Sequence, residues 1–175
     1  MSQILVSIIK ESNYKLTQFS EEAINAIENN IVIKNGKTYV KCLVRNKDIL
    51  LKPEEIVRQL YIYKLVHEYG YPVERMELER VINFGREKKR ADIVIFSKSN
   101  STAEEIIVEL KKPKLKDGKE QLKSYCNATG AIIGVWTNGD QISYYHRKDP
   151  NFFEDIPNIP NENQKLKEIL TERWT

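Results

Sequence analysis

The sequence has little of what several classes of protein require. It contains two cysteines and two histidines, and neither Cys42 with Cys126 nor His67 with His146 shows the spacing of a structural zinc site. We therefore expect both thiols to be reduced and at least half-buried. No Gly-rich phosphate loop is present, which argues against an ATPase motor or a nucleotide kinase. A methyltransferase motif is absent as well.

Long apolar runs are also missing. The longest fall well short of the roughly 18 residues that a membrane span requires. The N-terminus lacks the charged start and long apolar region of a signal peptide. Internal repeats, heptads and low-complexity tracts do not occur. We therefore expect a cytoplasmic protein without a membrane partner.

The composition is that of an ordinary globular protein. A chain of 175 residues with 41% hydrophobic and 30% charged residues is long enough for one domain with a proper core. The net charge of +3 gives little reason to expect nucleic acid, but basic residues cluster over 86–90 and 111–116. These runs could neutralise DNA phosphates, or they could be a solvated turn and loop. The candidate DNA-binding residues in them are Lys88, Lys89, Arg90, Lys112 and Lys114.

The most informative part of the chain runs from residue 90 to residue 125. Residues 90–96 and 106–113 are short runs rich in β-branched side chains and bounded by turn-forming residues, so they are predicted as strands. The link between them is short enough to pair the two strands as a hairpin, which could bring Asp92 beside Glu109. Side chains alternate along a strand, so Glu109 and Lys111 point to one face.

Two carboxylates and a lysine at the rim of a buried sheet favour a particular chemistry. Charged side chains are rarely buried unless they are paired or bind a metal ion. Mg²⁺ accepts one or two carboxylates together with phosphate oxygens, and a nearby lysine can stabilise charge that develops on a phosphate. Asp92, Glu109 and Lys111 therefore indicate metal-assisted hydrolysis of phosphodiester bonds. The structural alternative is that Asp92 caps a turn while Glu109 and Lys111 form a solvated pair on an edge strand.

The remaining elements are predicted from periodicity and from turn and cap residues. Proline at position 53 opens a largely buried helix that extends to about residue 69. We expect further helices over about 19–28, 119–129 and 162–173. Strands are expected over 4–9, 31–33, 38–44, 73–83, 131–136 and 141–146, with an Asn-Gly turn at 35–36.

The ordered motifs resemble those of the PD-(D/E)xK nucleases, and in particular the N-terminal nuclease domain of type I restriction enzyme R subunits. The resemblance extends from about residue 53 to about residue 139. One departure from the family pattern is that alanine, not proline, precedes the aspartate. The segments that carry the resemblance are Pro-Glu-Glu-Ile-Val-Arg-Gln (53–59), Gly-Tyr-Pro (70–72), Arg-Ala-Asp (90–92), Glu-Leu-Lys (109–111), Gln121 with Tyr125, and Thr-Asn-Gly (137–139).

The resemblance implies a fold and a set of catalytic residues. The expected fold is α/β, with a restriction-endonuclease-like core in which a central mixed β-sheet is flanked by helices, and a small N-terminal α+β extension. Asp92 and Glu109 would hold Mg²⁺, or Mn²⁺ in its place, with the Leu110 carbonyl as a further ligand. Lys111 would act with them in catalysis.

Three further residues are expected to support this site. By resemblance, Gln121 and Tyr125 lie on one face of their helix and belong with the active site or with DNA. The alternative is a tyrosine packed on the core with a surface glutamine. A glutamate on the helix that begins at residue 53 would reach toward the metal, and Glu55 is our choice. Its alternative role is to complement the helix dipole.

The expected function is that of a Mg²⁺-dependent endodeoxyribonuclease domain in a prokaryotic type I-like restriction-modification system. We expect an extension over 1–50, a nuclease core over 51–148 and a tail over 149–175 that leads into a longer protein. Its partners would be double-stranded DNA and the motor, methyltransferase and specificity parts of the complex. The alternatives are a catalytically silent DNA-binding or assembly module, a nuclease for RNA or single strands, and a Holliday-junction-type nuclease.

Overall fold

The computed structural model describes residues 16–111, 115 and 117–172. The predicted helices and most predicted strands are confirmed, and the strand predicted over residues 4–9 lies outside the described residues. The helices are α2 (Glu21–Glu28), α3 (Pro53–His67), α4 (Lys119–Thr129) and α5 (Leu166–Glu172), with a 3-10 turn η1 (Val73–Arg75). The strands are β1 (Ile31–Lys34), β2 (Lys37–Lys41), β3 (Asp48–Leu50), β4 (Met76–Phe84), β5 (Glu87–Phe96), β6 (Glu104–Leu110), β7 (Ile133–Thr137), β8 (Ile142–Asp149) and β9 (Phe152–Ile156).

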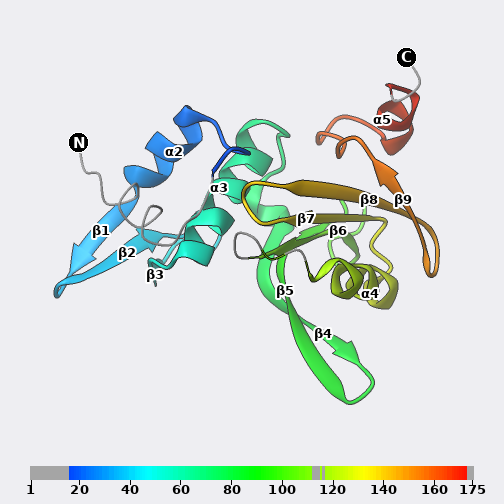
Figure 1. Ribbon diagram of the computed structural model, residues 1–175, viewed down its shortest axis with the longest axis horizontal. Coiled ribbons are helices and arrows are strands. Elements are labelled where there is room, and N and C mark those ends of the chain that lie inside the picture. Colours follow the sequence, from blue (N-terminus) through cyan, green and yellow to red (C-terminus); the bar gives the residue numbers. More distant parts are fainter. Residues whose placement is uncertain (1–15, 112–114, 116, 173–175) are drawn as a thin grey trace.

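A mixed six-stranded sheet forms the centre of the molecule, in the order β4-β5-β6-β7-β8-β9 (Figure 1). Only the β6–β7 pair is parallel, and α4 lies in the connection between these two strands. All other neighbours are antiparallel. The expected α/β fold, with a central mixed sheet flanked by helices, is therefore confirmed.

Each face of the sheet carries its own hydrophobic core. On one face, α3 packs its buried residues, among them Ile56 and Leu60, against inward residues of β5, β6 and β7. On the other face, α4 packs Leu122, Tyr125 and Cys126 against the opposite side of the same strands. Side chains alternate along each strand, so neighbouring residues of β6 serve the two cores in turn. Among the described residues, no helix is long and apolar enough to cross a membrane.

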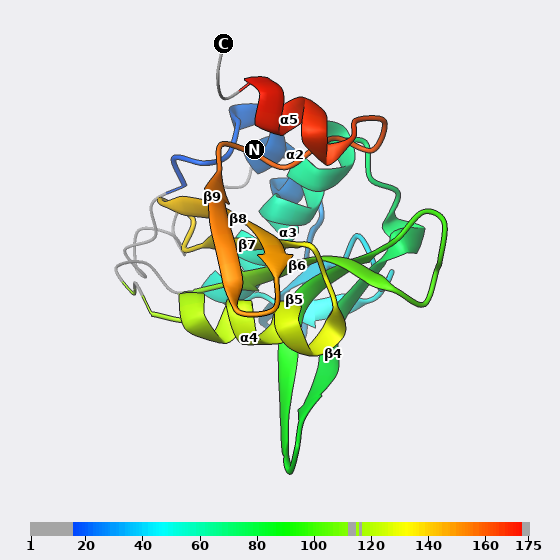
Figure 2. The same cartoon turned by 90° about the vertical axis from the view of Figure 1, so that its right-hand side faces the viewer.

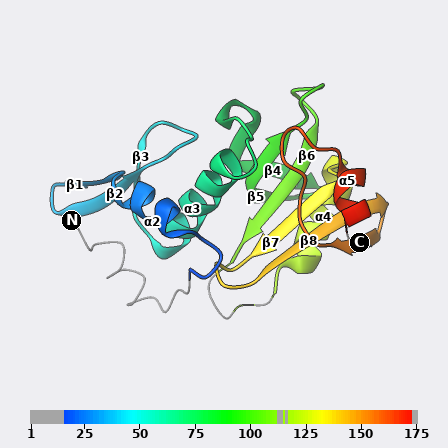
Figure 3. The ribbon, with the colours of Figure 1, turned by 90° about the horizontal axis from the view of Figure 1, so that it is seen from above.

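The N-terminal elements form a small second sheet beside α3 (Figure 3). The Ser20 hydroxyl caps α2 by accepting a hydrogen bond from the Ala23 amide at 3.1 Å. Asn35 and Gly36 both have positive φ, as a two-residue hairpin turn requires, and join β1 to β2. Strand β3 was not predicted. It is a short strand of three residues that pairs with β2.

Three differences from the sequence prediction concern the main sheet. Residues 73–75, expected to begin a strand, form the 3-10 turn η1, and β4 starts only at Met76. A solvated turn was one possibility for the basic stretch before Asp92, but residues 87–89 extend β5 beyond its predicted start and pair with the end of β4. Pairing between the two strands therefore decides the conformation of these charged residues, while the turn itself falls at 85–86. Strand β9 was also missed, and it extends the sheet into the predicted tail by pairing with β8. The two cysteines are free and buried, as expected.

Candidate active site

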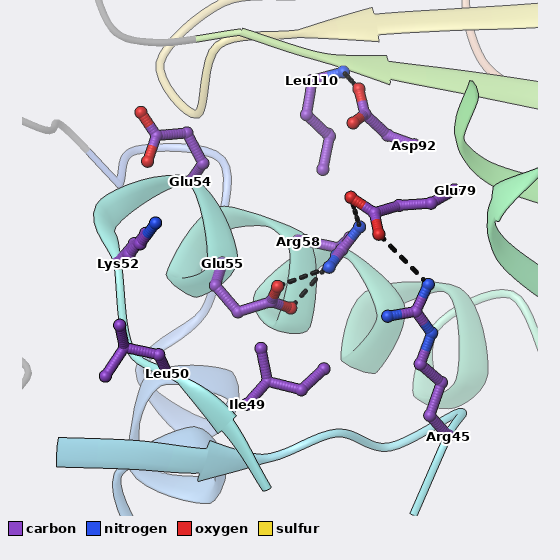
Figure 4. Close-up of a pocket in the computed structure, with 10 residues that line it drawn as sticks. All are labelled: Arg45, Ile49, Leu50, Lys52, Glu54, Glu55, Arg58, Glu79, Asp92 and Leu110. Carbon is purple, nitrogen blue, oxygen red and sulfur yellow. Dashed lines mark hydrogen bonds and ion pairs between the residues drawn. The ribbon is translucent and has the colours of Figure 1, made fainter. Parts of the chain in front are cut away.

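Asp92 lies where strands β5 and β6 separate. Their backbone pairing runs up to Ile93 and Val108 and does not continue to the next residues. Instead, the Leu110 amide donates a hydrogen bond of 2.7 Å to Oδ2 of Asp92 (Figure 4). The side chain of Asp92 thus replaces a backbone carbonyl as the hydrogen-bond acceptor where the pairing of β5 and β6 ends. This bond uses only one of the carboxylate's several lone pairs.

Glu109, one residue before Leu110, is buried next to Asp92. It is only 5% exposed, and its Oε2 is buried without a hydrogen-bond partner. Burial, a side-chain hydrogen bond with Asp92 and the charge of Asp92 raise the pKa of Glu109 to about 9, although Lys111 acts in the opposite direction. The two carboxylates therefore retain a proton at neutral pH unless a cation takes its place.

This donor set fits a hard divalent cation. A buried carboxylate oxygen without a partner, beside a second carboxylate, offers the oxygen ligands that Mg²⁺ and Mn²⁺ prefer. In the part of the chain that the structure describes, three or more His, Cys, Asp or Glu side chains nowhere come together in a group that could hold a metal ion. Any cation here would thus depend on two carboxylates, completed by backbone, water or substrate oxygens.

Lys111 follows β6 and is positioned by its backbone and by a glycine. Its amide donates to the Thr137 carbonyl at 2.9 Å, which fixes the residue against β7. Its side chain crosses Gly118, where a Cβ would lie 2.5 Å from Cε of the lysine. Gly118 has a φ of +96°, a conformation that glycine adopts at little cost. The loop before α4 therefore leaves room for Lys111 because position 118 has no side chain.

Gln121 and Tyr125 lie together on α4, as predicted. Nε2 of Gln121 donates a hydrogen bond of 2.5 Å to the Tyr125 hydroxyl. Burial raises the pKa of Tyr125 to about 12, and the charges of Glu109 and Asp92 contribute, while the hydrogen bond from Gln121 lowers it. The tyrosine also packs in the core under α4, so its structural role is observed, while the role of the pair at the active site stays a prediction.

Glu55 lies in a cavity of about 380 Å³ that is also lined by Asp92 and Leu110 (Figure 4). Its carboxylate is bonded to the Arg58 guanidinium and accepts a hydrogen bond of 2.8 Å from Nε2 of Gln59. Glu55 therefore reaches the same cavity as Asp92, but it is engaged by its own helix. A role beside a metal ion would require the Arg58 contact to adjust.

Three residues of this cavity were not singled out from the sequence. Nη1 of the buried Arg58 lies 3.7 Å from Oε1 of Glu79. Arg45, from the loop between β2 and β3, donates to the Leu78 carbonyl at 3.1 Å and contacts the carboxylate of Glu79 at 3.3 Å. The N-terminal extension, in which the sequence shows no chemical motif, thus contributes an arginine to the cavity.

The charged residues of this cavity shift one another's pKa values. Burial lowers the pKa of the Arg58 guanidinium, but neighbouring carboxylates, led by Glu55, outweigh this effect and raise it. Burial would raise the pKa of Glu79, but Arg58, Arg45 and Arg90 lower it. Glu79 also has a φ of +54° in the middle of a strand, which is uncommon for a residue other than glycine. No local sequence signal marks this position, because the conformation arises only where β4 passes the Asp92 region.

The candidate DNA-binding residues fall into two groups. Lys88, Lys89 and Arg90 are exposed on β5. Lys112 and Lys114 lie outside the described residues, so their prediction stays as it was.

The chain contains a sheet of the expected architecture with two adjacent carboxylates and a lysine at one end, an arrangement of the restriction-nuclease class. It belongs to the family described as type I restriction enzyme R protein N terminus, which matches residues 53–160, more than half of the chain. The resemblance drawn from the sequence motifs is therefore confirmed at the level of the family. By family, the chain is a restriction-type nuclease domain.

Solved structures that are similar to this chain include a restriction endonuclease and a candidate nuclease. The type IIG restriction endonuclease BpuSI matches with 18% identity and a TM-score of 0.44, over 66% of this chain and 14% of the endonuclease. A DUF820 candidate nuclease from Anabaena variabilis matches with 14% identity and a TM-score of 0.44, over 79% of this chain and 82% of that protein. The chain thus spans only a small part of the first of these proteins. No curated protein matches the sequence.

Proposed function

We propose that this domain hydrolyses DNA phosphodiester bonds in a reaction that depends on a divalent cation, as part of a type I-like restriction system. One observation carries the proposal: Glu109 is buried against Asp92 with an oxygen that lacks a partner, and Lys111 is close enough to lower the pKa of Glu109. A purely structural carboxylate pair at this position would leave a buried polar atom unsatisfied, which costs about 1–3 kcal/mol.

Asp92 and Glu109 would hold the cation, which is Mg²⁺ or Mn²⁺. When bound, the cation would neutralise the two carboxylates and polarise the phosphate. Asp92 keeps one oxygen on the Leu110 amide, and this contact fixes the orientation of its carboxylate toward the cavity. Lys111 would orient the attacking water and offset the negative charge that grows on the phosphoryl oxygens as the water oxygen bonds to phosphorus and one ester bond breaks.

Duplex DNA as substrate is supported by the family to which the chain belongs and by the exposed basic residues of β5. Methylation, translocation and sequence recognition would come from other domains or subunits of the restriction complex. The chain itself would supply the cutting site and part of the surface that binds phosphates.

The test is cleavage of supercoiled plasmid with Mg²⁺ or Mn²⁺, comparing the wild-type protein with Asp92→Ala, Glu109→Ala and Lys111→Ala. We expect each variant to lose nicking, while thermal unfolding shows that it remains folded. Lys148→Ala on β8 is a control, because it removes an exposed lysine of the same sheet that belongs to no candidate site. Nicking at the wild-type rate by the three variants would refute the proposal.

A substrate panel distinguishes the proposed activity from its alternatives. Duplex DNA, single-stranded DNA and RNA of the same sequence are each incubated with both cations. Cleavage confined to RNA or single strands would assign the site to another substrate. DNA binding without cleavage in any cation, by the full-length protein with its partners present, would indicate a module that only binds.

A further inference from the structure

Strands β4 and β5 form a two-stranded ribbon that extends beyond the rest of the molecule (Figures 1 and 2). In this outer part, pairing continues from Arg80 opposite Ala91 to Phe84 opposite Glu87. Every residue from 85 to 90 is exposed. The ribbon therefore presents its tip and both strands to solvent or to a partner.

The two faces of the ribbon differ in their surroundings. Residues directly opposite each other in an antiparallel pair share a face, so Ile82 and Lys89 lie on one face. Ile82 is 3% exposed and packs in the core under α4, together with Tyr125. This face is therefore turned toward α4, and Lys89 shares it.

The other face is open, and we refer to it as the open face. Its residues come from two cross-strand pairs, Val81 with Arg90 and Asn83 with Lys88. All four residues are exposed, and the exposed fraction of the apolar Val81 is 46%. Two cations, an amide and an exposed valine thus lie together on a surface that no other element covers among the described residues.

The open face continues toward the candidate active site. Arg90 lies two residues before Asp92, which corresponds to about 7 Å along a strand. Burial acts to raise the pKa of Glu79, but Arg58, Arg45 and, as the smallest of these effects, the charge of Arg90 lower it. Glu79 and Asp92 both line the cavity at the active site. The basic residues of the open face therefore lead into that cavity.

We propose that the open face of the β4–β5 ribbon lies in a groove of duplex DNA and guides the bound strand to Asp92. The inference rests on the proposed function and specifies how its substrate is held. A two-stranded ribbon fits the major groove, which is about 12 Å wide. Arginine, lysine and asparagine can contact phosphates and base edges there, and an apolar side chain can contact the thymine methyl group.

The composition of the open face favours a duplex over an unpaired strand. Proteins that hold single strands stack the bases on aromatic side chains. The open face has no aromatic residue, and the ring of Phe84 instead lies 5.5 Å from the ring of Tyr125 on the side of α4. Base pairs that are already stacked within a duplex need no such platform.

The experiment measures affinity for a fluorescent duplex by anisotropy across a salt series, in EDTA so that no cleavage occurs. The variants are Lys88→Gln, Arg90→Gln and the matched control Lys89→Gln. Each removes one charge from the same exposed strand, so overall electrostatics change equally. We expect Lys88→Gln and Arg90→Gln each to reduce the slope of log affinity against log salt by about 0.9, as the loss of one phosphate contact predicts. The inference separates Lys89 from the other candidate DNA-binding residues, because Lys89 lies opposite Ile82 on the face turned toward α4. Lys89→Gln should therefore leave the slope unchanged.

The outcomes separate this inference from the function on which it rests. An equal effect of all three substitutions, or of none, would overturn the ribbon assignment while leaving DNA binding intact. An equal effect of Arg90→Gln on a single strand of the same length would overturn the assignment to a duplex groove. Failure of the wild-type protein to bind any DNA would overturn the proposed function and the ribbon assignment together.

Discussion

The buried position of Glu109 predicts an unusual dependence of stability on pH. Its pKa is raised from the ordinary value of 4.5 to about 9 by burial and by Asp92. In this interval the folded protein binds a proton that the unfolded chain has already released. The free energy of unfolding should therefore fall as pH rises, by about 1.4 kcal/mol per pH unit. From about pH 6 to about pH 8.5 the loss is on the order of 3 kcal/mol.

The assay is urea unfolding in EDTA at both pH values, for the wild-type protein and for Glu109→Gln. The glutamine is neutral and nearly the same size, so this variant should lose the Glu109 contribution to the pH dependence. The contributions of other titrating groups, such as His146, whose pKa is lowered chiefly by burial, are common to both proteins and cancel in the comparison. An equal pH dependence in both proteins would show that Glu109 does not hold the proton, and the reasoning about a cation site would fail with it.

Addition of Mn²⁺ extends the same experiment. At about pH 8.5 the ion should restore stability to the wild-type protein, by about 2.7 kcal/mol when its concentration is a hundred times the dissociation constant. Glu109→Gln should gain little, because it offers a neutral amide in place of a carboxylate. A similar gain in both proteins would place the bound ion elsewhere.

Three further substitutions test the neighbourhood of the site. Gly118→Ala should slow plasmid nicking, because a Cβ there displaces Cε of Lys111 and because the left-handed backbone costs about 1 kcal/mol for alanine. Nicking at the wild-type rate would show that Gly118 does not position Lys111. Arg58→Leu should lower the free energy of unfolding by about 3–5 kcal/mol, since it leaves Glu55 buried with only the hydrogen bond from Gln59; a much smaller loss in urea titration would contradict this. Tyr125→Phe should cost about 1 kcal/mol of stability and reduce nicking several-fold, whereas a loss of stability alone would make the tyrosine purely structural.

The part of the site that the sequence could predict is the part carried by adjacent strands and by one helix face. The proximity of Asp92 and Glu109 could be predicted because a link as short as the one between the two apolar runs favours a hairpin. Gln121 and Tyr125 could be paired because residues four apart share a helix face. These inferences need only local geometry.

The part that could not be predicted depends on contacts between distant segments. Arg45 reaches Glu79 from a loop that is 34 residues earlier in the sequence, and no periodicity in either segment reveals this. A solvated turn was one possibility for residues 87–89 because they are charged, yet pairing with β4 makes them a strand. Burial of Glu109 is likewise a property of the packed sheet and not of its own sequence.

The cavity beside Asp92 is built by two parts of the chain, the segment before residue 53 and the region that matches the family. The region that matches the family begins at residue 53, yet Arg45, Ile49 and Leu50 form one wall of the cavity. The Leu43 amide also donates a hydrogen bond of 3.0 Å to Oε1 of Gln59, which links this segment to α3 near Glu55. A protein trimmed to the matched region would keep both carboxylates and the lysine but would open the cavity on one side. The segment before residue 53 thus shapes the cavity beside Asp92 although it lies outside the region that matches the family.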